Sequence, residues 1–291
     1  MTYTNKHGLP QPIYEALTRD PYRRVGDISV TQLIKPPLMV QIEKRHAGDI
    51  VEDASDRVWS LLGQSVHAII ERQDHTDRLS EERLVAEVFG WTISGKPDLL
   101  EPDDTLTDYK VTSVWAFLSG VKPEWAAQLN MYRWLYMQHG FTPKALQIVA
   151  ILRDWIMRKA ETDRSYPDCQ VHVVPVEVWT LERIGDFIRE RVHLHQAADN
   201  VPVDGIPVCT PAERWEKPTV WAVKKRGNKR ALPGGLCGSR DAAEAVASLK
   251  GFPCDIEERP GECTRCLRYC SAAPFCPYGR RVRTRKGGED G

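Results

Sequence analysis

The sequence has no long hydrophobic run and no export signal. No stretch of about 18 apolar residues occurs, which excludes an ordinary transmembrane helix. The N-terminal segment MTYTNKHGLPQPIYEALTRD has no apolar core behind a basic start, so it does not resemble a secretory signal. We therefore expect a cytoplasmic protein that does not associate with a membrane.

Net charge is absent as well. Lys and Arg total 40, as do Asp and Glu, so the overall charge does not favour a nucleic-acid partner. The charge is nevertheless unevenly distributed. The segment WAVKKRGNKR (221–230) has five basic residues and no acid, and RRVRTRK (280–286) is also rich in Arg and Lys. Each segment fits either contacts with phosphates or an ordinary solvated surface, and the sequence leaves both interpretations open.

Cysteine is missing from the first half of the chain. The eight cysteines begin at residue 169, and four of them lie within CTRCLRYCSAAPFC (263–276). A disulfide framework is not expected in a chain without an export signal. Four thiolates in so short a segment instead favour a metal centre, either Zn²⁺ or a 4Fe–4S cluster.

Hydrophobic periodicity predicts an α/β fold with a mixed central sheet flanked by helices. The expected helices span 29–46 (with a break at Pro36-Pro37), 55–73, 124–140 and 180–198. The expected strands span 83–90, 91–101, 105–112, 145–155 and 171–179. From about residue 200 the chain is rich in Pro, Gly and Cys. We therefore predict a core domain over 1–200 and a small α/β unit with the cysteine cluster over 201–291.

Two acids and a lysine fall on neighbouring predicted strands. Asp98 follows Pro97 at the end of one strand, and Asp108 and Lys110 lie two residues apart on the next. Residues two apart in a strand project from the same face, and a hairpin brings Asp98 beside them. Paired carboxylates bind a hard cation such as Mg²⁺ or Mn²⁺, and a lysine neutralises developing phosphate charge. Phosphodiester cleavage requires these groups, although a bare D-x-K also occurs on ordinary surface hairpins.

Two helices carry further candidates. Gly63, His67 and Glu71 share one helical face, where Gly63 would allow a close approach to the sheet and His67 would add a metal ligand. Gln128 and Tyr132 are also four residues apart on one face. Each feature alone also fits a purely structural role, because helical histidines and polar packing pairs are common.

Together these motifs resemble the RecB-type branch of the PD-(D/E)XK nucleases, which includes CRISPR-associated iron–sulfur exonucleases. The resemblance rests on G-x-x-x-H (63–67), G-x-P-D (95–98), D-Y-K (108–110) and Q-x-x-x-Y (128–132). It covers about residues 25–155 and the terminal cysteines. It implies a restriction-endonuclease-like core and a metal-dependent DNA nuclease, encoded by a phage or prophage. The expected activity is that of an exonuclease on DNA with a free end or a single-stranded portion, in recombination or repair and with a recombination or helicase partner.

The same resemblance assigns roles to individual residues. It implies that the catalytic metal is held by His67, Asp98, Asp108 and the backbone carbonyl of Tyr109. Lys110 would be the catalytic lysine, and Gln128 and Tyr132 would contact DNA or position the site. The alternative functions are a site-specific or structure-specific endonuclease and a non-catalytic DNA-binding module with a structural metal.

The cysteine pattern departs from that of these nucleases, which take one cluster ligand from before the nuclease motifs. This chain has no such cysteine, so the fourth ligand comes from elsewhere. We expect Cys209 to join Cys266, Cys270 and Cys276, with Cys263 as the alternative fourth ligand. A 4Fe–4S cluster is the expected cofactor at this site, and Zn²⁺ is the alternative.

Overall fold

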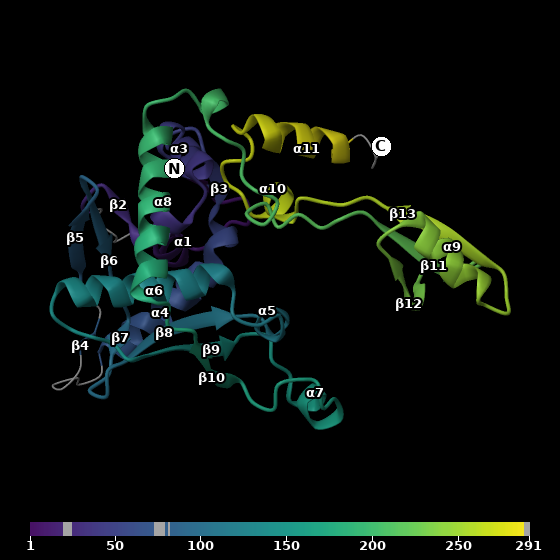
Figure 1. Cartoon of the computed structure of the whole chain (residues 1–291), viewed down its shortest axis with the longest axis horizontal. Helices are drawn as coiled ribbons and strands as arrows, with labels where there is room; N and C mark the ends of the chain where they lie inside the picture. Colours follow the sequence, from purple (N-terminus) through teal and green to yellow (C-terminus); the bar gives the residue numbers. More distant parts are fainter. Residues whose placement is uncertain (20–24, 73–78, 81, 288–291) are drawn as a thin grey trace. The chain divides into compact units, whose positions relative to one another are not determined.

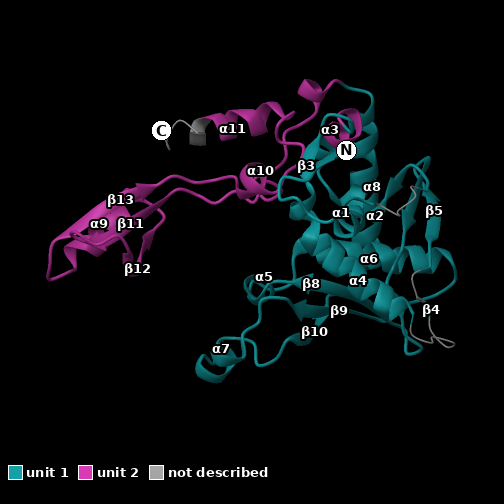
Figure 2. Cartoon of the chain, turned by 180° about the vertical axis from the view of Figure 1, so that it is seen from behind, with its two compact units in different colours: residues 1–40, 47–201 teal, residues 41–46, 202–291 magenta. Residues whose placement is uncertain are grey.

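The structure is a computed structural model that describes residues 1–19, 25–72, 79–80 and 82–287. The chain divides into two compact units, Met1–Val40 with Ala47–Val201 and Gln41–His46 with Pro202–Gly291 (Figure 2). The segment Gln41–His46 contains the end of helix α3 (Pro37–Arg45) and belongs to the second unit, which the sequence pattern did not indicate. Among the described residues, no helix is long and apolar enough to cross a bilayer.

The first unit contains the mixed sheet that the sequence predicts (Figure 1). Its strand order is β10-β9-β8-β7-β4, with β8 parallel to β9 and the other neighbours antiparallel. The bounds are β4 Leu79–Ser80, β7 Leu99–Leu100, β8 Thr105–Thr112, β9 Ala145–Leu152 and β10 Val171–Val176. Inward-facing Leu146, Ile148 and Ala150 alternate along β9 with less buried residues, as expected of a strand with one face on the core.

The predicted strand over 91–101 is broken, which corrects the sequence-based expectation. Its first part, β6 (Trp91–Gly95), pairs with β2 (Ile28–Ser29) and β5 (Leu84–Val88) in a separate three-stranded sheet. Its second part, β7, joins the central sheet. Pro97 lies at the break and has no N–H for a strand ladder. Asp98 therefore lies where the chain passes from one sheet to the other.

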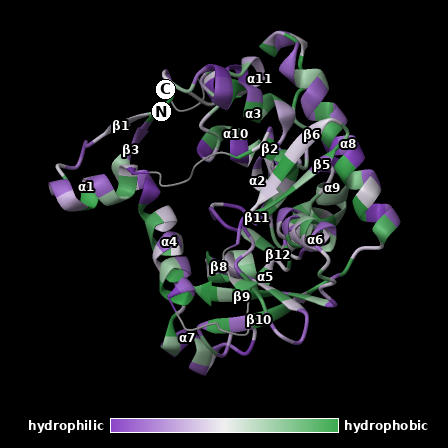
Figure 3. Cartoon of the chain, turned by 90° about the vertical axis from the view of Figure 1, so that its left-hand side faces the viewer, coloured by the Kyte–Doolittle hydropathy of each residue, from purple (hydrophilic) through white to green (hydrophobic). Residues whose placement is uncertain are grey.

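Three long helices are described in the first unit: two contact the central sheet, and the third packs against one of these two (Figure 1). Helix α4 (Val58–Glu71) follows the 3₁₀ turn η1 (Ala54–Arg57), and helix α6 (Pro123–Gln138) ends at His139 and Gly140, whose φ is +85°. Helix α8 (Leu181–Asp199) shows alternating hydrophilic and hydrophobic bands in Figure 3, as expected when one face is buried. The buried residues on α6 include Leu129, Met131, Leu135 and Tyr136, which form part of the core.

The remaining elements of the first unit are short. A two-stranded parallel sheet joins β1 and β3, and helix α2 begins with a capping box formed by Ser29 and Gln32. Their bounds are β1 Thr2–Thr4, α1 Gln11–Thr18, α2 Val30–Ile34, β3 Val51–Asp53, α5 Val114–Leu118 and α7 Met157–Thr162.

The second unit contains a three-stranded antiparallel sheet, β12-β11-β13, with helix α9 against it. The bounds are η2 Val203–Gly205, β11 Val220–Lys225, β12 Ala231–Cys237, α9 Arg240–Ser248, β13 Cys254–Arg259, α10 Thr264–Arg268 and α11 Pro277–Gly287. Its core is small and includes Val223, Cys237 and Ala243. Strands β11 and β12 form an antiparallel hairpin, and the basic segment 280–286 lies on helix α11.

Candidate active site

The register of the central sheet places Asp98 beside Asp108. Strands β7 and β8 are antiparallel with Leu99 opposite Thr107, so Asp98, one residue earlier, faces the position of Asp108. Asp98 Oδ2 accepts a 2.8 Å hydrogen bond from the backbone N–H of Tyr109. Tyr109 thus enters the site through its backbone, and the expected approach of the two acids is present.

Asp108 and Lys110 project from the same face of β8, as their two-residue spacing predicts. Lys110 Nζ lies 3.0 Å from Asp108 Oδ1 and 2.8 Å from Oδ2. The side chain of Asp108 is 2% exposed, whereas that of Lys110 is 22% exposed. The lysine therefore lies between a buried carboxylate and the solvent-accessible side of the site.

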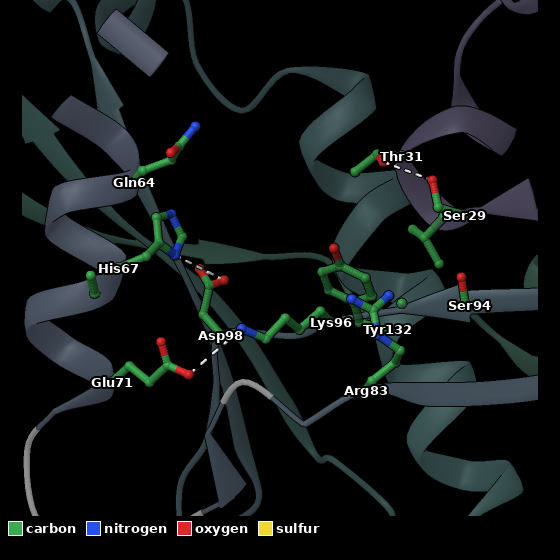
Figure 4. A pocket seen from close by; sticks show the side chains of 13 residues that line it. Ser29, Thr31, Gln64, His67, Glu71, Arg83, Ser94, Lys96, Asp98 and Tyr132 are labelled. Atoms are coloured by element: carbon green, nitrogen blue, oxygen red, sulfur yellow. Dashed lines mark hydrogen bonds and ion pairs between the residues drawn. The ribbon is translucent and has the colours of Figure 1, made fainter. Parts of the chain in front are cut away.

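Helix α4 brings His67 to the same site. His67 Nδ1 lies 3.2 Å from Asp98 Oδ1, and the two side chains are 32% and 10% exposed (Figure 4). The helix contacts β8, which explains why a residue 31 positions before Asp98 meets it. His67 therefore lies beside the acids.

Helix α6 completes the arrangement through a chain of hydrogen bonds. Lys110 Nζ donates to Gln128 Oε1 at 3.0 Å, and Gln128 Nε2 donates to the hydroxyl of Tyr132 at 3.0 Å. Tyr132 is buried. The i,i+4 spacing of Gln128 and Tyr132 makes their contact possible, but only the tertiary fold directs Gln128 to Lys110. All six side-chain candidates for catalysis thus lie in one connected region of the first unit.

Gly95 has a steric reason for being glycine. A Cβ atom at this position would lie 2.7 Å from Leu135 Cδ1 and 2.8 Å from Tyr132 Cε1. The absence of a side chain lets β6 approach α6 closely just before Lys96, Pro97 and Asp98. The expectation for Gly63 is wrong, because no described atom lies within 4 Å of a Cβ added there.

Burial and charge act together on Asp108. Burial raises the pKa of its carboxyl to about 6, the Lys110 ammonium opposes that rise, and the Asp98 carboxylate adds to it. A buried carboxylate with a raised pKa has too little compensating positive charge around it. This is the environment in which a bound cation would stabilise the ionised form.

A cavity of about 600 Å³ opens next to these residues. It is lined by side chains of α4, the start of α2, β6 and the segment after it, and by Tyr132 of α6 (Figure 4). His67 and Asp98 both face it, and Lys96 Nζ lies 3.7 Å from Glu71 Oε1 across it. The cavity residues Ser29, Thr31, Arg83 and Ser94 were not predicted, since no pattern connects them in the sequence.

The donor set suits a hard divalent cation. Asp98 and Asp108 offer carboxylate oxygens and His67 an imidazole nitrogen, which are ligands that Mg²⁺ or Mn²⁺ accepts. In this structure these atoms bond to one another, to Lys110 and to the Tyr109 amide. Among the described residues, the ligand atoms of one trio all lie within 4.8 Å of one another. This trio is Asp168, Cys169 and His172, and it is separate from the candidate active site.

The C-terminal cysteines gather in the second unit without forming disulfides. Burial raises the pKa of the Cys209 thiol to about 12, and Glu213, Cys276, Cys270 and Cys266 add smaller contributions. Burial likewise raises the pKa of Cys266 to about 11, with Cys270, Cys263 and Cys276 contributing. Cys263 Sγ lies 3.3 Å from the hydroxyl of Tyr278. The charges of the four preferred ligands thus act on one another, although their sulfur atoms are not among the described groups whose ligand atoms all lie within 4.8 Å. Four thiols are a ligand set that Zn²⁺ or an iron–sulfur cluster accepts.

The basic hairpin over 221–230 is partly neutralised. Lys224 pairs with Glu257, and Arg226 Nε lies 3.3 Å from Asp255 Oδ1 on the neighbouring strand β13. Trp221 packs against the small core of the second unit. Cross-strand ion pairs thus account for part of this charge, which supports the surface interpretation for these residues.

No family model matches the sequence, and no curated protein matches it. Among solved structures, the chain is similar to SSO0001, with a TM-score of 0.42 and 17% identity over 62% of this chain and 82% of that one. It is also similar to an alkaline exonuclease from Laribacter hongkongensis, with a TM-score of 0.37 and 15% identity over 58% and 87%. A phage-related exonuclease from Haemophilus somnus gives a TM-score of 0.29 and 14% identity over 65% and 77%.

Proposed function

We propose that this protein is a metal-dependent DNA nuclease whose active site comprises His67, Asp98, Asp108, Lys110, Gln128 and Tyr132. One observation carries the proposal. Lys110 Nζ connects the buried Asp108 to Gln128, while Asp98, just before β7, and His67 of α4 meet beside it. Two acids, a lysine and a histidine from β8, α4 and the segment before β7 thus converge next to a cavity.

Each residue has a distinct role in phosphodiester hydrolysis. Asp98, Asp108 and His67 would hold Mg²⁺ or Mn²⁺, with the carbonyl of Tyr109 as a further ligand. When bound, the cation stabilises negative charge on the phosphate and lowers the pKa of a water molecule. Lys110 donates hydrogen bonds toward the developing charge, and Gln128 holds the ammonium in place. Tyr132 in turn fixes the orientation of the Gln128 amide.

We infer an exonuclease that acts on DNA ends in recombination or repair, and a structural metal in the second unit. For the structural metal we favour Cys209, Cys266, Cys270 and Cys276 around a 4Fe–4S cluster, with Zn²⁺ as the alternative. Cys263 is the weaker candidate for the fourth ligand, because its thiol contacts the Tyr278 hydroxyl. The cluster would connect Cys209, which precedes β11 in the sequence, to the three cysteines that follow β13.

The decisive experiment is digestion of linear and closed circular DNA, single- and double-stranded, with Mg²⁺ or Mn²⁺. We expect loss of linear DNA only, and no loss with Asp108→Ala or Lys110→Met. Lys144→Met is the matched control, because Lys144 also pairs with an aspartate, Asp104, but is 75% exposed. Cleavage of circles would establish the endonuclease alternative. Full activity of Lys110→Met would refute the site, and no cleavage by the unmodified protein would favour the DNA-binding module.

A further inference from the structure

An exposed tryptophan pairs with an arginine at one end of helix α4. Trp59 is 54% exposed, and the guanidinium carbon of Arg153 lies 4.3 Å from the centre of its ring. Arg153 follows strand β9, far from Trp59 in the sequence. A cation over an indole is attracted by the negative face of the ring, so the pair is held together while much of the tryptophan remains accessible.

Two independent paths place this pair at a similar distance from the candidate active site. Along α4, Trp59 lies eight residues before His67, which corresponds to about 12 Å at 1.5 Å per residue. Along β8, Thr112 lies four residues after Asp108, which corresponds to about 13 Å at 3.3 Å per residue. The N–H of Arg153 donates to the carbonyl of Thr112 at 2.9 Å. Helix α4 therefore runs from the Trp59–Arg153 pair toward the candidate active site, and strand β8 runs from that site toward the pair.

Lys122 is a second cation that lies over an aromatic ring, with Nζ 4.8 Å from the ring centre of Trp125. Burial lowers the pKa of Lys122, the Glu124 charge opposes this shift and the Arg153 charge adds to it. Among the described residues, neither Arg153 nor Lys122 forms an ion pair with a carboxylate. Arg153 over Trp59 and Lys122 over Trp125 are cations on indole rings, an arrangement that favours an anionic ligand with a flat group, and a nucleotide has both features.

A second exposed tryptophan lies at this end of the sheet. Trp115, on helix α5 directly after β8, is 75% exposed. The helix is tied to the end of β9 because the N–H of Val114 donates to Asp154 Oδ1 at 2.7 Å. Trp115 and Arg153 thus follow the carboxyl ends of the adjacent parallel strands β8 and β9, and Trp59 of α4 lies against Arg153.

We propose that Trp59 stacks on an unpaired base of single-stranded DNA whose phosphates contact Arg153 and Lys122. The distance of about 12 to 13 Å to the candidate active site corresponds to three to four stacked nucleotides at about 3.4 Å each. A duplex keeps its base faces covered, so the substrate at this position is a single strand or a frayed end. The inference rests on the proposed nuclease function and defines its substrate.

Binding is measured with the full-length Asp108→Ala protein, which keeps the DNA intact, and a fluorescein-labelled dT oligonucleotide of twelve residues. Adding Trp59→Ala should weaken binding by between about fivefold and 150-fold, the range for loss of one base stack. Trp59→Phe, which keeps an aromatic face, should stay within about threefold of the parent. Arg153→Gln should reduce the slope of log K against log salt by about 0.7, because one phosphate contact is lost.

A series of oligonucleotides with a single abasic position identifies stacking itself. One abasic position should weaken binding to the parent as much as Trp59→Ala does, and the two changes together should give no further loss. Phe89→Ala is the matched control. Phe89 is also an exposed aromatic residue, at 43%, and the guanidinium carbon of Arg189 lies 5.7 Å from its ring centre, but Phe89 lies beside the β5–β6 sheet and not beside β8. This control should bind dT normally.

Three results would overturn the proposal: no measurable binding of dT to the parent, no effect of Trp59→Ala, or an equal loss for intact, abasic and blunt duplex DNA. The last result would assign Trp59 a purely structural role. Digestion of linear DNA by the unmodified protein is measured in parallel. Absence of digestion would refute the nuclease function alone, whereas digestion with unchanged binding by Trp59→Ala would refute only the stacking site.

Discussion

Replacing Asp108 by Asn tests the electrostatics of the site without any assumption about the substrate. The carboxyl is 2% exposed, and its pKa is raised from an ordinary 3.8 to about 6. A group whose pKa is higher in the folded than in the unfolded state favours folding below its unfolded pKa. That contribution is lost as the pH rises through the folded pKa. The unmodified protein should therefore lose stability between about pH 4 and pH 7 through this residue, whereas Asp108→Asn should not.

The size of the effect follows from the shift. One pKa unit corresponds to about 1.4 kcal/mol, so a shift of about two units gives about 2 to 3 kcal/mol across this pH range. The variant carries a neutral amide at this position at every pH. The prediction therefore concerns how the difference between the two proteins changes with pH. The free energy of unfolding of Asp108→Asn, relative to the unmodified protein, should increase by about 2 kcal/mol from pH 4 to pH 7.

Urea unfolding in the presence of EDTA at several pH values measures this difference. Saturating Mg²⁺ or Mn²⁺ should then stabilise the unmodified protein above pH 6, by about 2.7 kcal/mol at 100 times the dissociation constant, and leave Asp108→Asn almost unchanged. A difference that stays constant with pH would refute the argument that Asp108 is buried with too little compensation. Equal stabilisation of both proteins by the cation would refute its role as a ligand.

The other predictions concern single contacts. Gly95→Ala should lower the free energy of unfolding by about 1 to 3 kcal/mol through overpacking, whereas Gly63→Ala, which meets open space in a helix, should raise it by up to about 1 kcal/mol; urea midpoints test both. Gln128→Leu should slow single-turnover cleavage at least about tenfold while thermal unfolding stays unchanged, because Lys110 loses one of its two partners; an unaltered rate would contradict this. Cys270→Ala should remove bound iron or zinc, measured by elemental analysis, and reduce solubility; a soluble variant with full metal content would exclude the cysteine centre.

Some of the site follows from local geometry, and the sequence alone determined that part. Asp108 and Lys110 meet because residues two apart in any strand share a face, and Gln128 meets Tyr132 because residues four apart in any helix are neighbours. The helices and strands of the first unit are also encoded locally, because hydrophobic periodicity reports which face each element buries. Turn and cap residues such as Pro123 and Gly140 set the ends of α6.

The tertiary structure decided which of these pairs meet. No periodicity indicates that the chain changes sheets at Pro97, that Gly95 is pressed against Leu135, or that Gln128 holds Lys110. Nor does it place Trp59 under Arg153. Sequence patterns report the local preference of each segment, whereas these contacts depend on how distant strands align, as Ile28 of β2 does with Ile93 of β6, and on how helices pack over them. That alignment is set by the summed burial of the whole core, and it gives the local motifs a common site.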